Sequence, residues 1–171
     1  EAKDHLRDAV QMGARHGSDG LVALSWTNLA AVELARDRPR VADGMLDRAF
    51  ANRPDAPDPA WALVYLYRSV TRSLLGSAHE ATLALEEADR VESDEATFRR
   101  CRALTEAVRD VCAHGAASIA TARDALRRFD EASLAEGSSD ADAQILATVL
   151  TRVVERASLT TGAGRRRGAP R

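Results

Sequence analysis

The sequence predicts an all-α protein built from repeated pairs of antiparallel helices. A triplet of the form Ala-x3-Leu-x2-Ala begins at Ala2, Ala42 and Ala81, and a weaker copy begins at Ala122. The steps between these first members are 40, 39 and 41 residues, a period typical of a stacked array of one repeated unit. Within a triplet the spacing is i, i+4, i+7, which places all three side chains on one stripe of a helix. Because only 4% of the residues are aromatic, the core is expected to consist of Ala, Leu and Val.

Helix boundaries follow from glycines and prolines along the chain. Gly17, Gly76 and Gly115 are expected to follow the last residues of helices, because glycine accepts the left-handed conformation found there. Pro39 and the prolines at positions 54, 57 and 59 mark turns, because proline lacks a backbone donor and restricts the residue before it. The expected helices are about Ala2–His16, Leu21–Arg36, Arg40–Asn52, Ala60–Leu75, Ala78–Val91, Glu95–His114, Ala117–Leu134 and Asp140–Ala157.

The chain is expected to form one helical repeat domain over residues 1–157, followed by a disordered basic linker over 158–171. This last segment has no apolar periodicity and is rich in Gly, Ala and Arg. The chain begins at Glu1 inside a repeat unit, so it is expected to be a piece of a larger protein. No apolar run approaches the ~20 residues that span a bilayer, and we expect a cytoplasmic protein without a membrane partner.

The segment from Trp26 to Pro54 resembles the tetratricopeptide repeat. The resemblance implies a right-handed superhelix of antiparallel helix pairs, here in units of about 40 residues. Glu33 and Asp37 depart from the pattern, because they stand where a large aromatic residue and a turn glycine are usual. The residues that it implies for packing between helices are Trp26, Leu29, Ala30, Ala42, Leu46, Ala49 and Phe50 in the first full unit and Ala81, Leu85 and Ala88 in the second.

The long period resembles the superhelical region of large ATP-dependent LuxR-type transcription regulators. In that family an ATPase domain precedes the repeats and a helix-turn-helix domain follows them, and the arginine-rich tail here is similar to the linker before that domain. The resemblance implies a regulatory module of a bacterial transcription regulator that binds a peptide, a partner protein domain or a small effector. DNA would be bound only through a neighbouring domain. The alternative is a stand-alone scaffold or adaptor with no DNA-binding neighbour.

In tetratricopeptide arrays the first helix of each unit lines a concave groove. By this resemblance Trp61, Val64, Arg68 and Arg72 are expected to face the groove. The expected groove residues from the neighbouring unit are Thr27, Ala31 and Leu34.

Arg68 and Arg72 would suit a carboxylate or phosphate, and Trp61 offers a face for stacking. Two alternatives remain open. The arginines form a solvated face, or a register aligned on Gly76 places them in a packing seam. The seam is disfavoured, because it would bury two unpaired charges.

The last helix carries a wide apolar stripe, consisting of Ile145, Leu146, Val149, Leu150, Val153 and Val154. This stripe is expected to cap the repeats, and the alternative is a homodimer seam.

No catalytic motif or metal-ligand spacing is found, and the histidines at 5, 16, 79 and 114 fall on different elements. We therefore expect neither an enzyme nor a bound cofactor or metal.

Overall fold

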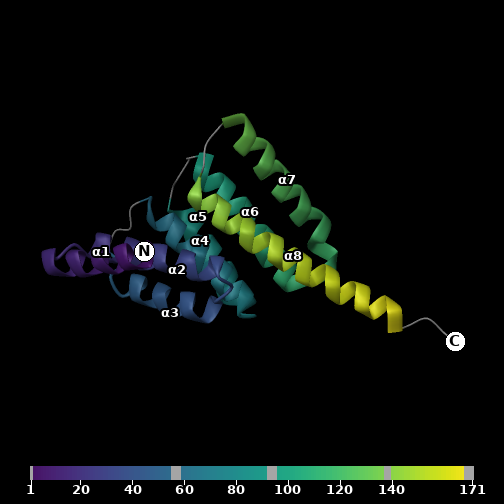
Figure 1. Ribbon diagram of the computed structural model, residues 1–171, viewed down its shortest axis with the longest axis horizontal. Helices are drawn as coiled ribbons and strands as arrows, with labels where there is room; N and C mark the ends of the chain where they lie inside the picture. Colours follow the sequence, from purple (N-terminus) through teal and green to yellow (C-terminus); the bar gives the residue numbers. More distant parts are fainter. Residues whose placement is uncertain (1, 55–58, 92–95, 137–139, 168–171) are drawn as a thin grey trace.

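The described parts of the chain are helical. A computed structural model describes residues 2–54, 59–91, 96–136 and 140–167, and within these ranges it contains no strand (Figure 1). Side chains are described for residues 4–54, 59–91, 96–135 and 140–160. The all-α prediction is thus confirmed for these ranges, and the expected connections at 55–58, 92–95 and 137–139 lie outside them. The elements are α1 (Ala2–His16), α2 (Asp19–Ala35), α3 (Pro39–Phe50), α4 (Trp61–Leu74), α5 (Ala78–Arg90), α6 (Ala96–His114), the short 3-10 helix η1 (Gly115–Ser118), α7 (Ile119–Glu136) and α8 (Ala141–Arg167).

Three of the turns between consecutive helices share one backbone design. Gly17, Asp37 and Gly76 have positive φ angles of 65°, 62° and 82°. In each turn the next residue donates its N–H to the carbonyl five positions earlier, at 2.9 Å. This bond satisfies one of the carbonyls left without a partner at the end of a helix. Asp37 therefore adopts the conformation that glycine usually supplies at this turn, at a cost in backbone strain.

The small residues of the second and third triplets are fully buried between helices. In the second and third triplets all six side chains are at most 3% exposed. Leu29 and Ala30 of α2 are buried as well, whereas Trp26 and Phe50 pack half-buried against the core. In the first triplet, Leu6 and Ala9 are only half-buried. The second and third triplets are therefore more completely buried than the described part of the first.

The helices are stacked, and the last helix, α8, also contacts an early member of the stack. Each helix contacts the next along the chain, and α2, α4 and α6 also contact one another in the order α2–α4–α6. A simple stack of repeats has contacts only between neighbouring units. Here α8 contacts α6 and α7 and also α2, which lies far earlier in the chain (Figure 1).

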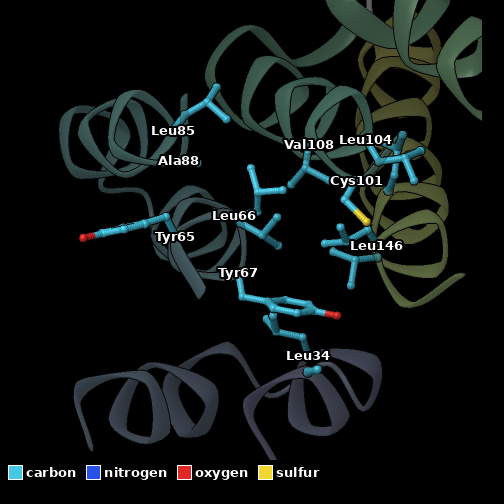
Figure 2. Close-up of a cluster of buried hydrophobic side chains, with 14 of the residues drawn as sticks. Leu34, Tyr65, Leu66, Tyr67, Leu85, Ala88, Cys101, Leu104, Val108 and Leu146 are labelled. Atoms are coloured by element: carbon cyan, nitrogen blue, oxygen red, sulfur yellow. The ribbon is translucent and has the colours of Figure 1, made fainter. Parts of the chain in front are cut away.

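The core joins α2, α4, α6 and α8. Tyr67 and Leu66 of α4 lie at its centre, with Leu34 of α2 beyond the Tyr67 ring (Figure 2). Cys101, Leu104 and Val108 of α6 and Leu146 of α8 complete it on the opposite side (Figure 2). The apolar side chains of α8 are therefore part of the main core and do not form a separate layer.

The last helix is longer than the sequence indicates. It was expected to end near Ala157, before a disordered segment, but α8 continues to Arg167 and extends beyond the rest of the molecule (Figure 1). The segment 158–167 contains two glycines, but it also contains Ala, Leu and Arg, which favour helices, and it has no proline. The hydroxyl of Ser158 donates to the carbonyl of Val154 at 2.8 Å within this extension. Residues 168–171 lie outside the described part.

Candidate functional site

The two arginines expected in a groove lie in a seam between α3, α4 and α5. Arg68 donates through one guanidinium nitrogen to Asp43 Oδ1 at 3.2 Å and to Asp47 Oδ1 at 2.6 Å, both on α3. Arg72 lies 3.1 Å from the same oxygen of Asp43 and 2.8 Å from Glu80 Oε2 on α5. We call these five residues the seam network.

The seam network corrects the expected register of α4. The register aligned on Gly76 was disfavoured because it would bury two unpaired charges, but Asp43 and Asp47 stand four residues apart on α3 and meet the arginines. With two cations and three carboxylates the network carries a formal charge of −1. Since carboxylates of the same chain occupy the guanidinium groups, the geometry does not support recognition of a carboxylate or phosphate here.

The remaining expected groove residues are buried. Thr27, Ala31 and Leu34 of α2 are at most 2% exposed, and the Thr27 hydroxyl donates to the Ala23 carbonyl of its own helix at 2.9 Å. Trp61 and Val64 of α4 are 4% and 3% exposed. The expected groove is therefore filled in part by the protein itself, because α8 contacts α2 and α6 and reaches Tyr67 of α4.

Polar contacts hold α8 near both ends of this covered face. Near the start of α8, Asp142 accepts a hydrogen bond of 2.5 Å from the Tyr67 hydroxyl. Burial, and then the nearby Asp142 carboxylate, hold the pKa of Tyr67 well above its usual value. Further along α8, Arg152 donates to the carbonyls of Leu34, at 3.4 Å, and Ala35, while Arg156 pairs with Asp37.

One part of the expected groove is open as a small apolar cleft. Trp61 and Val64 line a cavity of about 210 Å³ together with Gly20, Leu21, Ala23, Leu24 and Ala60. Leu21 and Leu24 are 41% and 46% exposed, so apolar surface continues outward from the cleft. The Trp61 ring also packs edge-on to Phe50, with ring centroids 5.8 Å apart, which takes up part of its stacking surface.

A second cleft, between α6 and α7, has a volume of about 360 Å³ and was not predicted from the sequence. Its floor is apolar and its rim carries both charges. The lining residues are Arg100, Ala103, Leu104, Glu106, Ala107, Asp110, Thr121, Asp124, Ala125, Arg128 and Phe129. The rim charges are tied to neighbours, as Arg128 pairs with Asp124 at 2.9 Å and Arg109 with Asp110 at 2.9 Å. Concave sites of this size with an apolar floor and few polar groups are typical of ligand and peptide binding.

A sequence signal for the α6–α7 cleft exists but is weak. Among the described side chains of α7, only Ala122 is fully buried. The weaker fourth triplet has phenylalanine, Phe129, in place of its last small residue. A large side chain at that crossing keeps the helices apart, because an alanine there would allow closer approach.

Comparison with known proteins adds no relative. No protein-family description, curated protein or solved structure matches this chain. Among the described residues, no helix is long and apolar enough to cross a membrane, and no three acidic, histidine or cysteine side chains are grouped so as to hold a metal ion. Cys101 and Cys112 are both free thiols.

Proposed function

We propose that this chain is a protein-interaction module of a multidomain bacterial transcription regulator, cytoplasmic in location and built from tetratricopeptide-like helix pairs in a superhelical array. The observation that carries the proposal is the α6–α7 cleft, an apolar, concave surface bordered by charges on a stack of helical hairpins. The buried residues of the second and third triplets and the shared turn design support the repeat character. The connection to transcription rests on the resemblance of the 40-residue units and the basic tail.

A small effector is the second candidate ligand for the same cleft. The cleft volume of about 360 Å³ lies within the range of small-molecule sites. A partner peptide is favoured over a small anion, because both arginines of the rim have carboxylates close by: Arg128 is 2.9 Å from Asp124, and Arg100 is 3.6 Å from Asp140. A stand-alone scaffold uses the same cleft. A helix-turn-helix encoded beyond Arg171 would favour the regulator, and another type of domain there would favour the scaffold.

Thermal stabilisation by added ligands tests the interaction function. Amphipathic helical peptides with basic or acidic flanks, and a panel of small anionic and sugar effectors, are added separately to the full chain. A ligand at about 100 times its Kd stabilises the folded state by about 2.7 kcal/mol. For a domain of this size, this corresponds to a rise in Tm of about 5–11 °C.

A matched pair of variants locates the binding site. Ala103 is an exposed residue that lines the cleft, and Ala103→Phe is expected to fill it and abolish the stabilisation. Ala120 is an exposed alanine on α7 outside the lining, and Ala120→Phe is expected to retain it. Stabilisation by effectors but not by peptides would indicate that the cleft binds a small molecule. No stabilisation by either panel would contradict the proposal.

A further inference from the structure

The face that α8 covers has the properties of a helix-binding surface. It is formed by α2, α4 and α6, the helices that contact one another through the stack. Seven side chains of α8 are at most 8% exposed, and α8 contacts α2 and α6 of this face as well as α7; the seven are Ala143, Leu146, Ala147, Val149, Leu150, Val153 and Val154. An amphipathic helix laid in an apolar groove is a recurring mode of peptide recognition, with anchors at helical spacing.

One end of this face selects for arginine. The carbonyls of Leu34 and Ala35 end α2, where the helix dipole is negative, and Asp37 adds a carboxylate in the following turn. Arg152 and Arg156 are four residues apart on α8, so both side chains reach this end from one side of the helix. An occupant of the face is therefore expected to carry both an apolar stripe and a pair of arginines near its C-terminal end.

The helix that precedes α8 is less deeply buried than the helices of the face. Ala122 is the one fully buried side chain among those described for α7, and the α6–α7 cleft separates part of the two helices. The hairpins α2–α3 and α4–α5 are closed by their own turns, and the seam network joins α3, α4 and α5, in both cases without a residue of α8. Removal of α8 would expose core side chains of α2, α4 and α6, but it would remove no partner from these turns or from the seam network.

We propose that the face of α2, α4 and α6 binds an amphipathic helix of a partner protein, and that α8 is its intramolecular competitor. The partner helix has apolar residues at the spacing of the α8 stripe and two arginines four residues apart that reach the C-terminal end of α2. The inference deepens the proposed interaction function by naming a second surface and its partner class. It differs from the cleft in its residues, so each is tested by its own variants.

The test uses a fluorescent, end-blocked peptide with the sequence of residues 141–160 and the full chain. In the wild type the peptide competes with an α8 present at an effective concentration near the millimolar range. Arg152→Ala/Arg156→Ala in the chain removes the anchors of the competitor but not the face. We expect the peptide to bind this variant at least about tenfold more tightly than the wild type, as judged by fluorescence anisotropy.

Two controls isolate the arginine anchors. A peptide in which both arginines are alanine is expected to bind the variant chain about tenfold more weakly. Arg123→Ala/Arg127→Ala, which removes an exposed pair at the same spacing on α7, is expected to leave peptide binding as in the wild type. If circular dichroism shows that the α8 double variant does not fold, Arg156→Ala alone gives the same comparison with a smaller expected increase in peptide affinity.

Three results would overturn the proposal. Equal affinity of the peptide for wild type and variant would show that the anchors do not control access. Absence of binding to a folded variant would make α8 a permanent core helix. A variant dimer that exchanges α8 between copies, seen by gel filtration and intermolecular cross-linking, would assign the face to a second copy of this chain. A normal response of the α6–α7 cleft to peptides in any of these cases would leave the proposed function intact.

Discussion

Replacing Arg68 with methionine is expected to destabilise the protein through the seam network. Methionine keeps an apolar stem of similar length but removes the charge and all the donors. The Arg68 side chain is 21% exposed and donates to two carboxylates, Asp43 and Asp47, whose side chains are 20% and 58% exposed. Without Arg68, Arg72 is the remaining cation among three carboxylates.

The size of the loss follows from the exposure of the two partners. A hydrogen bond to a charged group contributes about 1.5–3 kcal/mol, whereas a solvent-exposed ion pair contributes about 0.2–1 kcal/mol. Because Asp43 is largely covered and Asp47 is more exposed, we expect Arg68→Met to lower the free energy of unfolding by about 2 kcal/mol. For a domain of this size, this corresponds to a fall in Tm of about 4–8 °C.

Urea unfolding monitored by circular dichroism measures this loss, and a second substitution tests its cause. Asp43 is the carboxylate that both arginines contact. Asp43→Asn is expected to destabilise the wild type but to stabilise Arg68→Met/Arg72→Met, since it removes one of three uncompensated carboxylates. The network does not stabilise the fold if Asp43→Asn changes the free energy of unfolding in the same direction in both backgrounds. The same conclusion follows if Arg68→Met lowers that free energy by less than about 0.5 kcal/mol.

Three further predictions concern titration, backbone conformation and thiol reactivity. Because the pKa of Tyr67 is raised in the folded state, the folded form binds more protons than the unfolded form above pH about 10. The free energy of unfolding is therefore expected to fall there by up to about 1.4 kcal/mol per pH unit. Tyr67→Phe is expected to reduce this slope, as measured by urea unfolding at alkaline pH. Gly44→Ala lies inside α3 with open space around the new methyl group, and it is expected to stabilise the protein by about 0.5–1 kcal/mol. Gly76 has a φ of 82°, so Gly76→Ala is expected to destabilise the protein by about 1–2 kcal/mol. Shifts of Tm in the same direction for the two variants would contradict this. Burial raises the pKa of the Cys101 thiol to about 12 and that of the Cys112 thiol to about 11, but only Cys112 is exposed. Iodoacetamide at pH 8 is therefore expected to label Cys112 first, and mass spectrometry that found Cys101 labelled first would indicate opening of the core.

The local features of the fold could be predicted from the sequence, because they depend on residues close to one another in the chain. Gly17 and Gly76 follow the ends of helices as expected, and Ala42 and Ala81 are fully buried. The end of α8 was placed too early, because its glycines argued for a loop while the surrounding Ala, Leu and Arg favour a helix. Composition alone does not decide between these opposing tendencies.

The candidate sites were harder to predict, because they depend on contacts between distant elements. Arg68 and Arg72 were assigned to a groove because a packing seam would have buried two unpaired charges, but Asp43 and Asp47 supply the opposite charges from α3. The α8 stripe was expected to act as a cap or a dimer seam, and its periodicity identified the buried face without showing which helices cover it.

The contact between α8 and the end of α2 also determines how this chain can acquire its structure. Arg152 donates to the carbonyl of Leu34 across a separation of 118 residues. Arrays with contacts only between neighbours can form one unit at a time from either end. Here the inner face of the first hairpins is completed only after the segment around Arg152 has left the ribosome, since contacts of long sequence separation form late and slowly. Until then the nascent chain presents an uncovered apolar surface, which makes its synthesis the stage most exposed to aggregation and most dependent on chaperones.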